Sequence, residues 1–143
     1  MALTADTARN LVPAGPDSVN DLPVLTNTLI YQGSIVGSSA GYARGCVAGD
    51  KFMGINQHGQ ANNNPGASGA ILVRVVTKGV WRGMAITGAS GVADFGKNVY
   101  ASADDTLTLT PGSNTFIGRI CRYDPDTTKF DVAFEAESHR GGT

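Results

Sequence analysis

The feature of this sequence that most constrains its fold is a succession of short β-prone segments, separated by glycine, proline, asparagine and aspartate. They recur at intervals of roughly 8–12 residues, a spacing typical of β-sandwiches and barrels. No window shows convincing helical periodicity, although 88–97 could hold a short helix or a loop. The predicted strands span residues 28–36, 70–77, 80–86, 98–101, 107–110, 115–121 and 129–134, and 47–55 is expected to be a turn that leads into a short strand. We therefore predict an all-β chain that forms a small β-barrel or sandwich.

Alternation within these segments predicts which side chains share a face, because successive strand residues point to opposite sides. The residues expected to face the core together are Leu107 with Leu109, and Phe130 with Val132 and Phe134. Asp131 then takes the opposite face. The Lys78-Gly79 pair predicts a tight hairpin turn between 70–77 and 80–86. With 19 glycines and only 16% charged residues, the composition favours a turn-rich β protein of one domain.

The first 28 residues differ from the rest, since they hold three of the six prolines and no aromatic residue. A residue before proline is pushed toward an extended conformation. We predict an extended N-terminal arm over 1–28, a β domain over 29–135 and a C-terminal tail over 136–143. The arm either is a leader without a function or orders on a partner, and its apolar groups favour the partner. The residues expected to bind that partner are Leu11, Val12, Pro13, Leu22, Pro23, Val24 and Leu25.

Charge and hydropathy argue against two classes of partner. The formal net charge is −1 and the basic residues form no run, which argues against nucleic acid. No apolar run approaches the ~18 residues of a membrane span. The first residues lack a basic start and an apolar stretch, so we expect a chain made in the cytoplasm.

Cys46 and Cys121 each stand alone in an apolar segment, which favours two buried thiols. The sequence does not decide whether they form a disulfide with each other.

Patterns that resemble catalytic motifs are incomplete. The segment 91–98 nearly matches a phosphate-binding loop, but Asn98 replaces the hydroxyl residue and no helix is expected to follow. Ser68 lies in a partial nucleophile elbow, and neither His58 nor His139 lies where a rigid base is expected. The acidic pairs 104–105 and 124/126 are interpreted as turn residues, in preference to ligands that bind a cation loosely. We predict no enzyme activity, no cofactor and no metal.

Trp81 is the only tryptophan. A single tryptophan is either a core anchor or an interface anchor, since tryptophan is enriched in binding hot spots. Both interpretations stay open at this point.

The order of the β segments resembles a known family. The matching patterns run from Gly33-Ser34-Ile35-Val36-Gly37 through Ala48-Gly49-Asp50-Lys51-Phe52, Lys78-Gly79-Val80-Trp81 and Gly96-Lys97-Asn98-Val99-Tyr100 to Phe130-Asp131-Val132-Ala133-Phe134. Over about 28–134 the chain resembles the DUF2190-type capsid decoration (cement) proteins of tailed bacteriophages. The resemblance implies a β-barrel-like domain, often a trimer, that binds the major capsid protein on the outer surface of the assembled virion head. It implies no catalytic residues.

A head or tail spike or fibre module that contacts a host receptor is the alternative function. Such a module would use exposed loops, and 57–68 carries the strongest loop signal in the chain.

Overall fold

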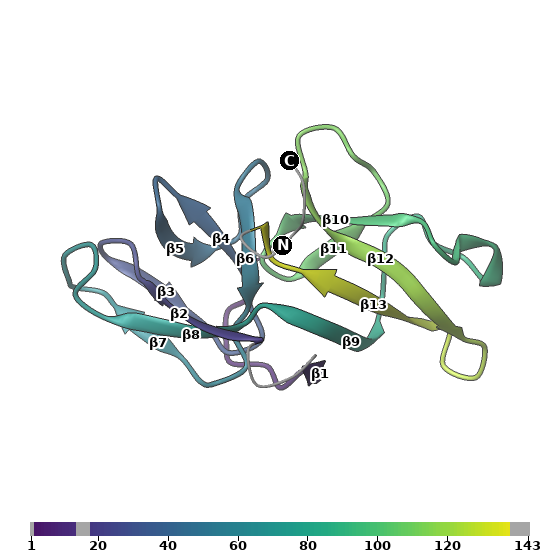
Figure 1. The fold of residues 1–143 in the computed structure, drawn as a ribbon, viewed down its shortest axis with the longest axis horizontal. Helices are drawn as coiled ribbons and strands as arrows, with labels where there is room; N and C mark the ends of the chain where they lie inside the picture. Colours follow the sequence, from purple (N-terminus) through teal and green to yellow (C-terminus); the bar gives the residue numbers. More distant parts are fainter. Residues whose placement is uncertain (1, 14–17, 138–143) are drawn as a thin grey trace.

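The computed structural model describes residues 2–13 and 18–137, which form an all-β, sandwich-like fold (Figure 1). The elements are β1 (Asn10–Pro13), β2 (Val19–Pro23), β3 (Thr28–Ile30), β4 (Ile35–Ser39), β5 (Tyr42–Gly45), β6 (Lys51–Ile55), β7 (Ala61–Asn63), β8 (Leu72–Val76), β9 (Lys78–Met84), the 3-10 turn η1 (Val92–Asp94), β10 (Asn98–Ala103), β11 (Thr106–Thr108), β12 (Thr115–Asp124) and β13 (Lys129–Glu135). The all-β prediction is confirmed. None of the helices in the described part of the chain is long and apolar enough to cross a membrane.

Two antiparallel sheets make up most of the fold. The larger sheet has six strands in the order β1-β9-β13-β12-β10-β11, and the smaller has five in the order β2-β8-β6-β4-β5. Strands β3 and β7 form a separate ladder. A single bridge joins Val24, just beyond β2, to Ala43 on β5, and the sheets are not closed into a barrel. Of the two predicted architectures, the sandwich is therefore the one that fits.

The main core lies on the inner face of the larger sheet. Leu11, Trp81, Val132 and Ile120 lie side by side across four neighbouring strands and are all at most 8% exposed. Residues opposite one another on neighbouring strands point to the same face, so these four form one apolar row. On the smaller sheet, Phe52 packs edge-on against Phe134, with ring centroids 6.1 Å apart. This contact joins the two sheets in one hydrophobic cluster.

The apolar side chains predicted to face the core on the later strands do so, but the alternation is not strict, because Thr108 and Asp131 are buried as well and the β13–β9 ladder has a register shift at 130–132. Phe130, Val132 and Phe134 are all buried in the main core. Leu107 is 2% exposed, and Leu109 packs partly buried against the same cluster.

The hairpin turn predicted at 78–79 is wrong. β8 and β9 belong to different sheets with only Thr77 between them, so the chain passes directly from one sheet to the other. The Thr77 carbonyl accepts a 2.7 Å hydrogen bond from the Ala136 amide, which fixes this crossing point. Gly79 is instead a strand residue, and a Cβ there would collide with the carbonyl of Val12. Its glycine serves the close approach of β1, not a turn.

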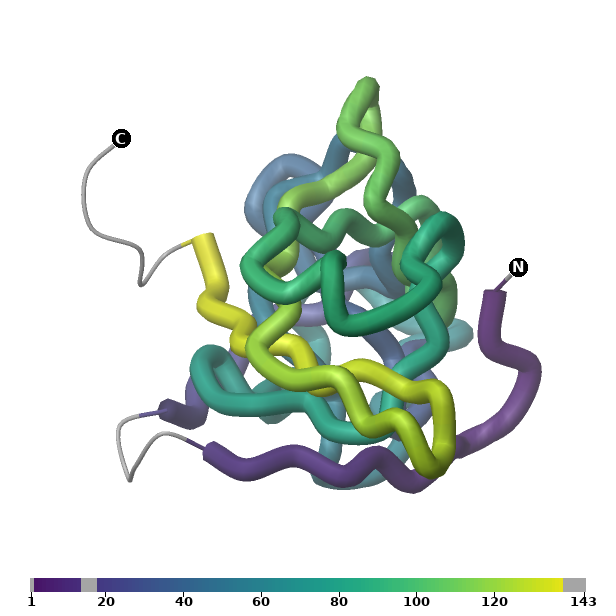
Figure 2. Tube along the Cα trace, turned by 90° about the vertical axis from the view of Figure 1, so that its right-hand side faces the viewer, coloured from purple at the N-terminus to yellow at the C-terminus, as the bar shows by residue number. Residues whose placement is uncertain are grey.

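The prediction of an unpacked arm is wrong for 10–13 and 19–25. β1 is an edge strand of the larger sheet and β2 an edge strand of the smaller, and the N-terminal segment runs along the body of the molecule (Figure 2). Leu11 is 8% exposed, Leu22 9% and Val24 0%. These side chains complete the protein's own core, which gains more from burying them than from leaving them for a partner. Residues 14–17 lie outside the described residues.

The residues before β1 are also tied to the body. The Leu3 amide donates to Asp104 Oδ1 at 2.9 Å, and the Thr7 amide donates to the Gln32 carbonyl at 2.7 Å. Arg9 Nε donates to the Gly33 carbonyl at 3.0 Å. The predicted tail at 136–143 also begins inside the fold, because Ala136 is fully buried, whereas 138–143 lie outside the described residues.

Candidate functional site

The structure separates the seven predicted partner-binding residues into three groups. Leu11, Leu22 and Val24 point into the protein's own core and are not accessible to a partner. Pro23 and Leu25 are half-buried beside the smaller sheet. Val12, 41% exposed, and Pro13 lie on the outer face of the larger sheet.

Trp81 is a core anchor. Its side chain is fully buried, and the guanidinium of Arg9 lies over its ring, 5.2 Å from the centroid. The hypothesis that Trp81 forms an oligomer or capsid interface is therefore wrong, because the side chain is already enclosed by its own chain. Burial lowers the pKa of Arg9, and the nearby carboxylates Asp105 and Asp104 oppose that shift.

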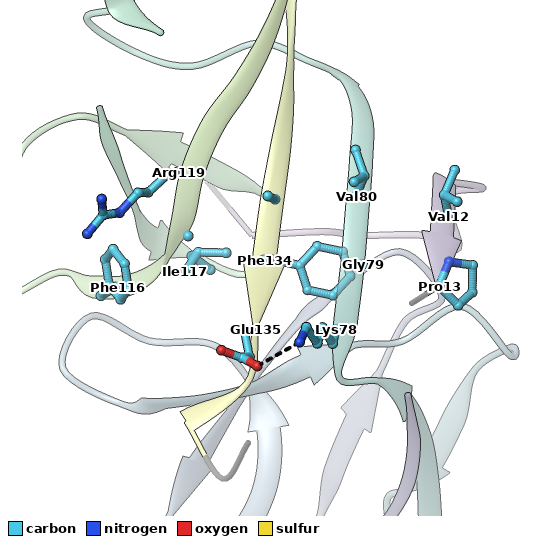
Figure 3. A pocket seen from close by; sticks show the side chains of 12 residues that line it. Val12, Pro13, Lys78, Gly79, Val80, Phe116, Ile117, Arg119, Phe134 and Glu135 are labelled. Atoms are coloured by element: carbon cyan, nitrogen blue, oxygen red, sulfur yellow. Dashed lines mark ion pairs between the residues drawn. The ribbon is translucent and has the colours of Figure 1, made fainter. Parts of the chain in front are cut away.

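An open groove, which we call the outer groove, crosses the outer face of the larger sheet (Figure 3). Its volume is about 600 Å³. The residues at its centre come from one register row, in which Val12 lies opposite Val80, Val80 opposite Ala133, and Ala133 opposite Arg119. Because Ala133 is the smallest member of this row, the sheet surface is hollow there.

The rim of the outer groove combines aromatic and charged groups. Phe116 stands beside Arg119 at one side, and its ring packs edge-on against Tyr100 with centroids 5.7 Å apart. Lys78 and Glu135 form an ion pair at 3.4 Å at one end (Figure 3). An apolar floor bordered by a few charges is the composition typical of a protein-binding patch.

A second hollow of about 620 Å³ continues the same face. Arg82 lies two residues from Val80, and Asn10 two residues from Val12, so they share that face. Asp131 accepts a 3.1 Å hydrogen bond from the Gly83 amide. The remaining charged residues of this hollow are Arg122, Asp124 and Lys129.

The two hollows together carry a positive charge. Five basic and three acidic residues line them, a formal charge of +2 on a chain whose net charge is −1. Across 2–13 and 18–137, the side chains of Arg119 and Arg82 have no ion-pair or hydrogen-bond partner. An uncompensated cation beside an apolar surface favours an acidic partner.

The segment that nearly matches a phosphate-binding loop is a closed turn. Lys97 Nζ donates to Asp94 Oδ1 at 2.7 Å, and the amides of Ser90 and Gly91 donate to Asp94 Oδ2 at 2.7 and 3.1 Å. The Lys97 hydrogen bond, followed by these amides, lowers the pKa of Asp94 to about 2. The lysine that a phosphate would need is thus engaged within the turn.

The 57–68 segment is less loop-like than its composition predicts. It contains β7, and the buried Asn63 donates from Nδ2 to the carbonyls of Leu25 and Ala67 at 3.0 and 2.9 Å. His58 is exposed in this segment, whereas His139 lies outside the described residues. These side-chain bonds pin the loop to the smaller sheet, since a buried amide must find acceptors.

The two cysteines are unpaired thiols. Burial raises the pKa of the Cys46 thiol to about 11, and burial also raises the pKa of Cys121. Both thiols are therefore protonated and weakly nucleophilic near neutral pH.

Sequence reasoning missed the outer groove. The alternation of β13 places Ala133 on the opposite face from Val132 and Phe134, and this could be predicted from the sequence. The residues that neighbour Ala133 on other strands could not be predicted, because they depend on the register between β9, β12 and β13.

In the described part of the chain, no group of three or more His, Cys, Asp or Glu side chains is placed to hold a metal ion. Comparison of the chain with protein-family models, with curated proteins and with solved structures finds no match.

Proposed function

We propose that this protein is a bacteriophage capsid decoration protein, which binds the major capsid protein on the outside of the assembled head and stabilises it. The observation that supports a binding function is the outer groove, an apolar hollow on a hydrogen-bonded sheet. The capsid as the partner is supported by the order of the β segments, which resembles that of the cement family. In this proposal the protein has no catalytic role.

Stabilisation of the head then follows from mass action. A ligand that binds only the assembled shell stabilises it by RT ln(1 + [L]/Kd), which is about 2.7 kcal/mol per site at a concentration 100 times Kd. Many copies on one head multiply this effect. We include a homo-oligomer in the proposal, with a trimer favoured, because closed symmetry repeats one contact several times.

The structure changes how the proposal is tested. Deleting residues 1–25 would remove β1, β2 and part of the core, so loss of binding by that variant would report unfolding. The intact protein is instead mixed with expanded heads that lack it, and its sedimentation with heads is measured. A mass measurement of the free protein reports its oligomeric state.

Electron microscopy of the mixture separates the two candidate functions. Regular density over the whole head, together with a higher melting temperature of the head, is the expected result. Density confined to the tail or to the vertices would favour a spike or fibre module. Absence of binding to heads would refute the decoration function.

A further inference from the structure

We infer that the outer groove of the larger sheet, with the arginines beside it, is the docking surface of this protein, and that its occupant is an extended protein segment with apolar side chains flanked by carboxylates. As a statement about heads, this inference rests on the proposed function, because it identifies the face that meets the capsid. The chemistry of the partner is testable without heads, on the isolated protein.

The shape of the groove indicates an extended segment. Val12, Val80 and Ala133 form one row across three strands, and the hollow above them is open to solvent. Antiparallel strands lie about 4.8 Å apart, so this row spans roughly 10 Å. That length fits a few residues of extended chain, with one or two apolar side chains lowered onto Ala133.

The charges indicate that the flanking groups are acidic. Arg119 closes the apolar row on β12, and its guanidinium has no ion-pair or hydrogen-bond partner within the described residues. Arg82 lies in the adjoining hollow, two residues from Val80, and its guanidinium also has no ion-pair or hydrogen-bond partner within the described residues. A guanidinium recognises a carboxylate through two parallel hydrogen bonds, and among residues 2–13 and 18–137 no carboxylate pairs with either arginine.

The same charges argue against a second copy that docks through the same face. Two faces of charge +2 would repel each other in a symmetric face-to-face dimer.

The glycines beneath the surface also indicate a site of fixed shape. A Cβ at Gly118 would collide with the Ala133 carbonyl, so β12 and β13 are held closely together beneath the groove. The surface is therefore formed before the partner arrives.

The first experiment tests the partner chemistry without heads. The probe is the capped pentapeptide Asp-Val-Ile-Val-Asp, titrated into isotope-labelled full-length protein while backbone amide shifts are recorded. Saturable shifts at Val80, Ala133 and Arg119 are expected, with at least tenfold weaker binding of the matched peptide Lys-Val-Ile-Val-Lys. Equal affinity for both peptides, no binding, or shifts confined to other surfaces would overturn the inferred chemistry.

The second experiment tests the face on heads. Ala133→Arg fills the groove and Arg119→Glu reverses its cation, and both positions are exposed, so both variants are expected to fold. The matched controls are Ala70→Arg and Lys51→Glu, at exposed positions that belong neither to the larger sheet nor to either hollow. Circular dichroism and melting temperature are measured for all four.

At least a tenfold loss of head binding is expected for the two groove variants and none for the controls. If wild-type protein binds heads and the groove variants bind equally well, the docking face is wrong while the decoration function stands. If wild-type protein does not bind heads at all, the decoration function fails, and the peptide titration alone then decides whether the groove takes an acidic apolar segment. Weaker binding of wild type at higher salt is also expected, since exposed charges are screened.

Discussion

Replacing Leu11 by alanine is expected to destabilise the fold, whereas replacing its neighbour Val12 is not. The two residues are adjacent on the edge strand β1, but Leu11 points into the core and is 8% exposed, while Val12 points outward and is 41% exposed. Comparing the stabilities of the two alanine variants therefore tests whether the N-terminal segment is part of the fold or an accessory arm. It does so without shortening the chain.

The magnitude follows from the burial. Leu11→Ala removes three buried carbon atoms, worth about 2.4 kcal/mol at ~0.8 kcal/mol each. The cavity that remains adds to this cost, and the edge position lets neighbours relax, so the lower part of the usual range applies, about 2–3 kcal/mol. Val12→Ala is expected to cost about 0.5 kcal/mol or less, as at other exposed positions.

Urea denaturation of wild type and both variants measures these differences, provided that the m-values agree. For a chain of this size each kcal/mol lowers the melting temperature by ~2–4 °C, so Leu11→Ala should melt roughly 4–12 °C lower. A Leu11→Ala variant that is as stable as Val12→Ala would refute the assignment of β1 to the core. That result would mean that β1 contributes little to the core and that the N-terminal segment is an accessory arm.

Three further predictions concern other parts of the fold. Gly118→Ala should cost at least about 1–3 kcal/mol because its Cβ meets the Ala133 carbonyl, and an unchanged melting temperature would contradict this close packing. Asn63→Ala should cost about 1–3 kcal/mol by leaving buried carbonyls without a donor and should speed amide exchange in 61–67; slow exchange like that of wild type would show that the loop is held otherwise. Asp94, with a folded pKa of about 2 against ~3.9 unfolded, contributes stability that is complete above about pH 4 and is lost as the pH falls through about 2. The melting temperatures of wild type and Asp94→Asn should therefore converge between pH 4 and pH 2, and a constant gap would argue against the ion pair with Lys97.

The sequence by itself determined the fold class and most strands. Local alternation is enough for this, because a strand with a buried face must repeat apolar residues at every second position. Phe130, Val132 and Phe134 could be placed on one face from their spacing alone, and the structure buries all three. The absence of a helical repeat in the sequence likewise excluded a helical fold.

Only the tertiary structure decided which strands are neighbours. Two β-prone segments joined by Lys78-Gly79 look like a hairpin locally, yet Thr77 carries the chain from one sheet to the other. The proline-rich start looks like a free arm, yet it supplies one edge strand of each of the two main sheets. In both cases the choice depends on which distant strand each segment pairs with. A short stretch of sequence does not contain that information, because the pairing partner lies far away along the chain.

The candidate site depended on the tertiary structure for the same reason. The outer groove brings together Val12, Val80, Ala133 and Arg119, four residues spread over β1, β9, β13 and β12. Each of them is unremarkable in the sequence, since an exposed valine, alanine or arginine on a strand is common. Their juxtaposition exists only because the register of three strand pairs aligns them in one row, and register is a property of the whole sheet.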